Sequence, residues 1–467
     1  MSIDTSTISA RFQFRGNEIV GNPYNAALVL GDHPAFAGML GWDEFHDQVV
    51  LWHEVPAEHG DMRPPRRGEP RPLDNIDLTA ITEALNSCGL VKLSEGVVFG
   101  AVHRIARRRP YHPVKVYLEG LIWDGVERLG RPSGASTRSP GCVNAGAEPP
   151  LGHAEAVPSL ESPLEGHVGH AGAVSWLTRY FGAEDGEYTR TVGRAPLLAM
   201  IARIYEPGCK FDYLTILEGV QGAKKSTCVS ILASPWFSDS LPCDITSKDA
   251  SIALKGLWGV EIGELSVFKK AEVEDLKRFI SRTAEKYRPP YAKLEILQPR
   301  SCVFWGTTND DTYLTDATGN RRFFPVRVKK LDEEALRADR DQLMAEALVA
   351  YRKGEPWWVG EEFEEKFARA EQAARMVEDP WQGKVSIYVK NRNRLTYSQI
   401  FESALGIETK DLNGLHKSRM ARVMSALGWK FLQVAGTKVW VSPTREESPG
   451  VRERAGWRPF GEEAPAA

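Results

Sequence analysis

The segment from residue 214 to residue 233 constrains the fold of this chain more than any other. An apolar run over 214–217 predicts a buried strand, glycines follow at 219 and 222, and Lys-Ser-Thr then opens a helical pattern. In a strand–loop–helix unit of this kind, backbone N–H groups surround phosphate oxygens, a lysine neutralises them and a hydroxyl binds Mg²⁺. The segment therefore predicts a phosphate-binding loop, with nucleotide contacts from Gly219, Gln221, Gly222, Lys224, Lys225, Ser226 and Thr227.

Two lysines stand side by side in this loop and have different expected roles. Lys225 would reach the β- and γ-phosphates, and the Ser226 hydroxyl would bind Mg²⁺. Lys224 departs from the usual pattern, which has glycine directly before the phosphate-binding lysine. A side chain at this position crowds the tightest part of the loop and makes a positive φ costly. The alternative interpretation is an ordinary strand–turn–helix with basic surface residues.

Acidic residues follow in a second apolar run at 257–265, which contains Glu261 and Glu264. ATPases with a phosphate-binding loop place one acid at the end of such a strand to support Mg²⁺ and another to orient the attacking water. We assign the water-activating role to Glu264 and the metal-side role to Glu261, and the reverse assignment stays open.

Two further segments complete the expected order of elements. Residues 302–309 form a third apolar run that ends in Asn309, whose amide would contact the γ-phosphate or the attacking water. The turn at 318–325 carries Arg321 and Arg322. Arginine stabilises the charge that develops during phosphoryl transfer, so this pair is a catalytic candidate.

Residues from about 23 to 328 resemble the virulence-associated protein E family of phages, plasmids and genomic islands. The ATPase core of that family is similar to those of superfamily-three helicases and satellite-phage primase–helicases. The resemblance rests on YLEGLIWDG (117–125), EGVQG (218–222), KST (225–227), EIGEL (261–265), YRPPY (287–291), GTTN (306–309) and TGNRRF (318–323).

The resemblance implies an α/β P-loop NTPase fold of the AAA+ type, with ATP and Mg²⁺ bound between the subunits of a ring, expected to be a hexamer. It also implies that Arg321 or Arg322 is a finger that serves the adjacent subunit. The family usually has glycine where this chain has Lys224.

Length and amino-acid composition limit the number of domains and the class of protein that this chain can be. A chain of 467 residues with 42% apolar and 26% charged residues predicts two to four globular domains. The net charge of −3 excludes a polycation, so any DNA contact must come from local basic patches. No apolar run approaches the roughly 18 residues of a membrane span, and the six scattered cysteines are typical of reduced thiols, so we expect a cytoplasmic protein.

The pattern along the chain predicts a series of segments. Residues 130–172 are rich in Gly, Pro, Ser, Ala and His and lack apolar periodicity, which is typical of a disordered linker or insertion. The full prediction is a disordered tail at 1–21, a mostly helical domain at 22–129, that linker, a helical lead-in at 173–210, the ATPase domain at 211–360, a helical connector at 361–384, a winged-helix-like domain at 385–442 and a disordered tail at 443–467.

Basic and aromatic residues suggest three places for nucleic acid. Around the Pro-Pro sequence at 289–290, Arg288, Tyr291 and Lys293 combine charge with stacking surfaces, which suits single-stranded DNA. In the C-terminal helix–helix–hairpin pattern, Lys417, Arg419 and Arg422 would face DNA, although such domains also dock proteins. The basic end of the helix predicted at 97–109 would either meet phosphates or complement the helix dipole.

Taken together, these features predict an ATP-dependent DNA helicase or replication initiator of a mobile genetic element that moves on single-stranded DNA. Double-stranded DNA, a primase and host replication proteins are further expected partners, and no membrane contact is expected. The alternative is a nucleotide-gated DNA-binding or regulatory protein whose ATPase is weakened by Lys224. A small-molecule kinase is a more distant alternative, because no acceptor pocket or lid is evident.

Overall fold

The computed structural model describes residues 5–56, 65–66, 68–132, 174–242, 244–264, 270–290, 294–314, 319–329, 331–377, 379–434 and 437–443. The chain divides into two compact units, Met1–Asp311 with Arg321–Gln372 and Thr312–Asn320 with Ala373–Ala467. Most of the predicted linker at 130–172 and nearly all of the predicted tail at 443–467 lie outside the described residues. Within the described ranges, none of the helices combines the length and the apolar character that a membrane span needs.

The N-terminal part of the first unit combines helices with short strands, and the strands were not expected in the mostly helical domain predicted at 22–129. Its helices are α1 (Pro23–Asp32), α2 (Asn75–Ser87), α3 (Glu95–Ala106) and α4 (Pro113–Glu119). One sheet has the order β1 (Phe14–Arg15), β2 (Glu18–Val20), β6 (Leu90–Val91), and the other has the order β5 (Arg71–Pro72), β4 (Gln48–Leu51), β3 (Leu40–Asp43), β7 (Pro110–Tyr111). Strands this short leave almost no alternating apolar pattern, which is why the sequence did not indicate them.

Residues 5–21 also differ from the disordered tail predicted at 1–21. Ile8 and Phe12 are buried in the same hydrophobic core as residues of α1 and α3. The buried Asn25 side chain donates to the carbonyl oxygens of Gln13 and Val20, both at 2.8 Å. These contacts make this segment part of the folded domain.

The centre of the first unit is a five-stranded sheet in which all strands are parallel. Its order is β14 (Phe323–Arg327), β8 (Leu214–Glu218), β13 (Val303–Thr308), β10 (Gly259–Ile262), β9 (Phe237–Ser238). The chain runs from β8 to the far edge at β9, returns through β10 and β13, and then crosses to β14 on the other side of β8. In open parallel sheets, ligands bind beyond the carboxyl ends of the strands where the order reverses, so the topology directs attention to the end of β8.

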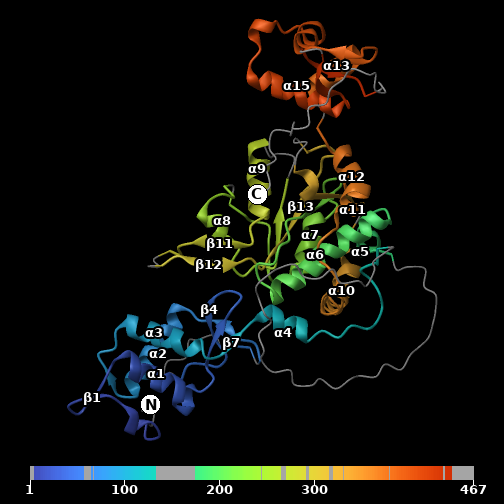
Figure 1. The fold of residues 1–467 in the computed structure, drawn as a ribbon. Helices are drawn as coiled ribbons and strands as arrows, with labels where there is room; N and C mark the ends of the chain where they lie inside the picture. Colours follow the sequence, from blue (N-terminus) through green and yellow to red (C-terminus); the bar gives the residue numbers. More distant parts are fainter. Residues whose placement is uncertain are drawn as a thin grey trace. The chain divides into compact units, whose positions relative to one another are not determined.

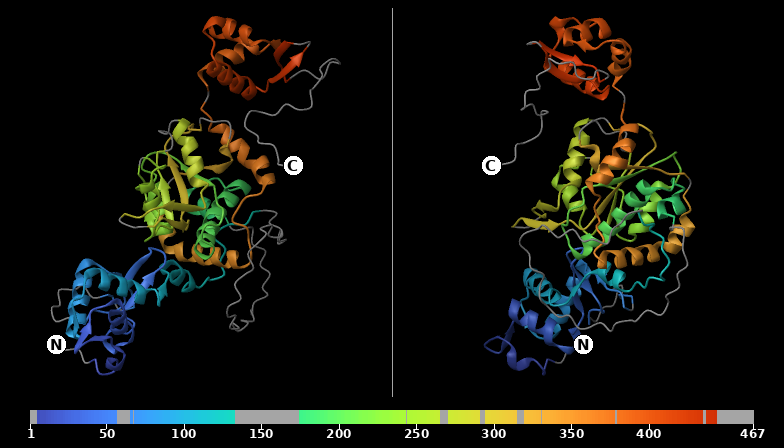
Figure 2. Two further views of the ribbon diagram at one scale, coloured as in Figure 1. Left: turned by 60° about the vertical axis from the view of Figure 1, so that its left-hand side comes forward. Right: turned by 45° about the vertical axis from the view of Figure 1, so that its right-hand side comes forward.

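Helices cover both faces of this sheet, as Figures 1 and 2 show. Trp305 of β13 lies in one core with residues of the helices on the first face, namely α5 (Trp176–Phe181), α6 (Glu187–Tyr205), α7 (Lys225–Ala233) and α10 (Glu333–Arg352). Successive strand residues point to opposite faces, and Phe304 meets Phe279 of α9 (Lys270–Ile280) with ring centroids 5.4 Å apart. The mixed α/β class with a parallel sheet, predicted from sequence, is thus confirmed.

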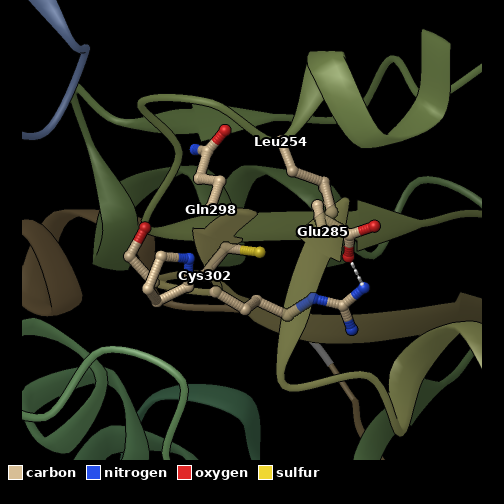
Figure 3. A pocket seen from close by; sticks show the side chains of 7 residues that line it. Leu254, Glu285, Gln298 and Cys302 are labelled. Atoms are coloured by element: carbon tan, nitrogen blue, oxygen red, sulfur yellow. Dashed lines mark hydrogen bonds and ion pairs between the residues drawn. The ribbon is translucent and has the colours of Figure 1, made fainter. Parts of the chain in front are cut away.

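A two-stranded hairpin, β11 (Ala284–Tyr287) with β12 (Ile296–Pro299), lies between β10 and β13 in the chain. Figure 3 shows the small pocket at its base, which Leu254, Glu285, Gln298 and Cys302 help to line near α8 (Lys248–Ala253). Glu285 and Arg300 form a buried ion pair there, and Ser251 donates to Glu285 at 2.7 Å. Burial opposes ionisation, but Arg300 lowers the pKa of Glu285 below its ordinary value. These partners fill the pocket with structural contacts and anchor the hairpin.

The segment that contains the YLEGLIWDG sequence lies along α10. Tyr117 donates through its hydroxyl to Asp341 at 2.6 Å, and the backbone N–H of Asp124 donates to Gln342 at 2.9 Å. The backbone N–H groups of Arg128 and Leu129 both donate to the buried carboxylate of Glu346 in α10. These hydrogen bonds attach α4 and the residues that follow it to α10.

The second unit holds the C-terminal elements. Its helices are α13 (Pro380–Val389), α14 (Tyr397–Ile400) and α15 (Gly414–Ala426), and its antiparallel sheet has the order β15 (Arg394–Leu395), β17 (Thr437–Val441), β16 (Lys430–Val434). The helix, helix and hairpin predicted from sequence are present. The short α11 (Glu361–Phe363) and α12 (Arg369–Ala374) lie in the range predicted as a connector, and α12 ends two residues into the second unit.

Candidate functional site

The candidate site is built around the loop between β8 and α7, at the carboxyl end of β8 where the strand order reverses. Gly219 directly follows β8, and a Cβ atom there would lie 2.8 Å from the carbonyl oxygen of Val328, so glycine is required for this close approach. Gly222 has a φ of +82°, which glycine adopts without strain. Gln221 is exposed in the loop, and Thr227 is half-buried in the first turn of α7.

Lys225 begins α7 and turns its ammonium group back into the loop. Nζ donates to the carbonyl oxygens of Gly219 at 2.7 Å and Val220 at 3.1 Å, and to Oδ1 of Asn309 at 2.8 Å. Burial lowers the pKa of Lys225, while the charge of Glu261 opposes that shift. The charged group therefore rests on neutral oxygens, which an anion such as a phosphate would replace favourably.

Glu261, in β10, connects the helix and the neighbouring strand. Its Oε1 accepts from the hydroxyl of Ser226 at 2.7 Å and from the hydroxyl of Thr307 at 2.6 Å. The side chain is only 4% exposed, and Oε2 is buried without a hydrogen-bond partner. An oxygen of this kind beside a serine hydroxyl fits a hard cation such as Mg²⁺, which prefers carboxylate and hydroxyl oxygens.

Glu264 lies two residues beyond β10, and its exposure and backbone conformation differ from those of Glu261. It is exposed, and its φ is +51°, an uncommon backbone conformation for a residue with a side chain. Positive φ at a non-glycine residue costs free energy and is concentrated at functional sites.

Lys224 also adopts the left-handed conformation, with φ 59° and ψ 32°. The conformation that the sequence analysis described as costly for a side chain is therefore the one present. Its Nζ forms an ion pair with Oε1 of Glu333, the first residue of α10, at 2.5 Å. Side chains of both residues are substantially exposed, so the pair contributes little to stability.

The two arginines of the 3-10 helix Asn320–Arg322 have different environments. The Nε of Arg322 donates to the Ser281 hydroxyl at 2.9 Å, and the same nitrogen is 3.5 Å from a carboxylate oxygen of Asp212. Arg321 is exposed. Arg322 thus connects distant parts of the chain, whereas the charge of Arg321 acts on Glu364 and opposes the rise that burial causes in the pKa of that carboxylate.

Some of the residues expected to contact nucleic acid are exposed, and others lie outside the described residues. Arg288 is exposed just beyond β11, while Tyr291 and Lys293 lie outside the described residues. In α15, Lys417 and Arg422 are exposed.

The structure places Arg419 differently from Lys417 and Arg422, because its side chain is engaged within the unit and only partly exposed, so its contact with DNA stays a prediction. The guanidinium of Arg419 makes a two-nitrogen contact with Asp379, in which Nε lies 2.8 Å from Oδ2 and Nη2 lies 2.8 Å from Oδ1. It also stacks 4.1 Å from the ring centroid of Trp381. Arg419 therefore fastens α15 to the start of α13.

Sequence reasoning missed several partners of the site residues, Thr307, Glu333 and Ser281 among them. Thr307 stands inside the GTTN sequence but received no role, although a hydroxyl two residues before Asn309 on the same strand was a usable signal. Glu333 and Ser281 left no signal, because they lie 109 residues from Lys224 and 41 residues from Arg322 along the chain.

A comparison with known protein families gives a match over the part of the chain that contains these residues. The family model of the virulence-associated protein E-like domain matches residues 165–377. Residues 165–377 are therefore similar to the virulence-associated protein E-like domain. The match spans the loop before α7, Glu261, Asn309 and both arginines, so the whole candidate site lies within the matched range.

Solved structures with some likeness to the chain include two of the NrS-1 C-terminal region. An apo structure has 11% sequence identity and a TM-score of 0.40, covering 86% of this chain and 95% of that chain. An A-form apo structure has 14% identity and a TM-score of 0.34, covering 57% of this chain and 73% of that chain. No curated protein matches the chain in sequence.

Proposed function

We propose that this protein is an ATP-driven DNA motor, a helicase or replication initiator of a mobile genetic element, which hydrolyses ATP at the loop before α7. The observation that carries the proposal is the convergence of Lys225, Asn309, Ser226, Glu261 and Thr307 at one edge of the parallel sheet. The virulence-associated protein E-like domain supports a replication-related role in a mobile element.

In this proposal, Lys225 exchanges its carbonyl and amide contacts for the β- and γ-phosphates of ATP. Mg²⁺, held through Ser226 and Glu261, would supply positive charge to the phosphate oxygens. Thr307 keeps the Glu261 carboxylate oriented through its hydrogen bond at 2.6 Å. Asn309, released by Lys225, would then contact the γ-phosphate or the attacking water.

Glu264 is proposed as the residue that orients the attacking water and accepts its proton. Its exposure and its position after β10 allow it to approach a phosphate bound at the loop. Arg321 is proposed as the finger that enters the site of the adjacent subunit, since Arg322 is held within its own subunit. This arrangement requires a ring of subunits, with a hexamer as the expected state.

The hairpin of β11 and β12 is the proposed DNA-contacting element of the motor. Its base is fixed by the buried pair of Glu285 and Arg300, and its far end carries exposed Arg288 and Leu294. A fixed base with a basic, apolar end suits contact with the phosphates and bases of single-stranded DNA. In the second unit, Lys417 and Arg422 are proposed to contact the DNA backbone.

Nucleotide binding tests the proposal directly. Titration of a fluorescent ATP analogue in the presence of Mg²⁺ should give saturable binding to the wild type, and Lys225→Ala should abolish it. Lys210→Ala, which changes an exposed lysine of the same unit, is the matched control and should bind normally. Glu261→Gln should remove the dependence on Mg²⁺. Absence of Mg-ATP binding by the wild type would refute the proposal.

A second candidate function rests on the backbone of Lys224. Its left-handed conformation and its contact with Glu333 favour a nucleotide-gated DNA-binding protein that hydrolyses ATP poorly. DNA-stimulated ATPase activity separates the two candidates. A wild type without activity and an active Lys224→Gly variant would favour the gated binding protein over the motor.

A further inference from the structure

The solvent-facing side of α3, in the N-terminal part of the chain, has an unusual composition. The helix buries Val98, Ala101, Val102 and Ile105 in the domain core. The opposite side, named here the α3 face, consists of Gly96, Phe99, Gly100, His103, Arg104 and Arg107. None of these residues takes part in the nucleotide site, so the face needs a separate explanation.

Two glycines of α3, Gly96 in its first turn and Gly100 in its middle, are the first indication of a partner. Gly96 and Gly100 are exposed, and a Cβ atom added to either would meet nothing within 4 Å. Packing inside the protein therefore does not require glycine at these positions. Glycine lowers helix stability relative to alanine, and it leaves the backbone open to close approach by another molecule.

Beside the glycines, aromatic rings form a continuous row. Phe99 is 49% exposed, and its ring centroid lies 3.9 Å from that of His103. The His103 ring is in turn 5.8 Å from Trp42 of β3. An exposed phenylalanine ring that packs against a second ring offers an aromatic surface on which a planar group stacks.

Cationic groups continue the same row. The guanidinium of Arg107 lies over the Trp42 ring, 3.9 Å from its centroid, with its side chain 61% exposed. This stacking orders the guanidinium and leaves its outer surface open. Arg104 is exposed one helical turn earlier.

The other two arginines at the end of α3 are also exposed, but they contact α1 and Trp52 rather than Trp42. Arg108 turns toward Gly31 and Asp32 of α1, and Arg109 stacks on Trp52 and donates to the carbonyl of Gly38. This division leaves Arg104 and Arg107 as the cations of the α3 face. The carboxylate nearest to Arg107, Asp47 at 3.9 Å, also contacts Lys255 at 3.1 Å, so it neutralises neither cation fully.

We propose that the α3 face binds single-stranded DNA. A base stacks on Phe99, a second base stacks on the outer surface of the Arg107 guanidinium, and Arg104 neutralises the intervening phosphate. Gly96 and Gly100 let the sugar–phosphate backbone approach the helix. Duplex DNA fits less well, because its bases are stacked on one another and cannot lie flat on Phe99. This surface needs no ATP, and it adds a strand contact separate from the nucleotide site.

Binding of the full-length, nucleotide-free protein to a fluorescent 20-mer of deoxythymidine tests the proposal by anisotropy. Arg104→Glu combined with Arg107→Glu should weaken binding at least tenfold and reduce the slope of log affinity against log salt by about 1 to 2. Phe99→Ala should weaken binding about fivefold or more. Arg15→Glu, which reverses an exposed arginine of the same domain on β1, should change affinity less than twofold.

Gly100→Ala separates a binding role from a structural one. Alanine favours the helix, so the melting temperature should rise, while the added methyl group should weaken DNA binding. Cross-linking with 5-iodouracil-containing single strands locates the contact, since a modified peptide containing Phe99 or His103 is expected. The proposal is overturned if the double arginine variant binds within twofold of the wild type and no cross-link falls on α3, or if a duplex of equal length binds more tightly. Because no nucleotide is present, failure here leaves the ATPase proposal untouched.

Discussion

Replacing Lys224 with glycine should relax the loop that precedes α7. At φ 59° and ψ 32°, the Cβ atom of Lys224 lies close to the following carbonyl group. This conformation costs a residue with a side chain about 1–2 kcal/mol relative to glycine. Glycine in turn loses about 0.5–1 kcal/mol through the greater freedom of the unfolded chain. The ion pair with Glu333, whose side chains are 52% and 32% exposed, contributes about 0.5 kcal/mol at most after solvent screening.

These terms give different results for matched variants. Lys224→Gly should leave the free energy of unfolding nearly unchanged, because relief of strain offsets the other two losses. Lys224→Ala retains the strain and loses the ion pair, so it should be less stable than the glycine variant by about 0.5–1 kcal/mol. Glu333→Gln removes only the ion pair and should cost about 0.5 kcal/mol at most.

Thermal unfolding followed by circular dichroism compares the three variants. For a domain of this size, the glycine variant should melt about 1–4 °C above the alanine variant. DNA-stimulated ATPase activity, measured on the same samples, should be highest for Lys224→Gly, because its loop no longer carries a side chain at the tightest position. If the alanine variant is as stable as the glycine variant, Lys224 is not strained and the reasoning from its backbone conformation is refuted.

Three further predictions concern residues that the fold holds in place. Arg321→Ala should abolish most ATP turnover while leaving nucleotide affinity within a few-fold of the wild type. Arg322→Ala should lower the free energy of unfolding by about 1–2 kcal/mol. Equal turnover in both variants would contradict the assignment of the finger. Arg419→Ala should destabilise the C-terminal unit by about 1 kcal/mol in urea, with little loss of DNA affinity at low denaturant. Glu285→Gln should cost about 3 kcal/mol at pH 7, since it leaves Arg300 buried without its counter-charge. The pKa of Glu285 is lowered in the folded state. The stabilisation that its carboxylate provides is therefore complete above the ordinary glutamate pKa of about 4.3 and is lost as the pH falls through the folded value. The variant lacks this group, so its acid-unfolding curve should be flatter than that of the wild type.

Much of the candidate site follows from the order of residues along the chain. Each expected side chain in the central sheet stands in or just after a buried apolar run, as Glu261 and Asn309 do. The carboxyl ends of parallel strands meet at one edge, so these residues converge once the strands are parallel. The loop geometry follows similarly, since Gly219 and Gly222 occupy positions where a side chain would clash or be strained.

Other features depended on contacts between distant parts of the chain. Arg321 and Arg322 are adjacent and chemically identical, and their environments differ through the contacts of Arg322 with Ser281 and Asp212, which are distant in the chain. Arg419 was expected to face DNA because helical spacing placed it there, but Asp379, 40 residues earlier, holds it.

The sequence by itself determined the position and the local geometry of the loop between β8 and α7, because that loop is a local strand–turn–helix whose residues are close in the chain. The tertiary structure alone decided which basic residues are available to a partner and which are used inside the fold. The physical reason is that a guanidinium group finds its carboxylate or indole by proximity in space, and chain distance carries no information about that proximity. At the end of α3, the same rule pairs Arg107 with Trp42, Arg108 with Asp32 and Arg109 with Trp52, although all three residues stay exposed.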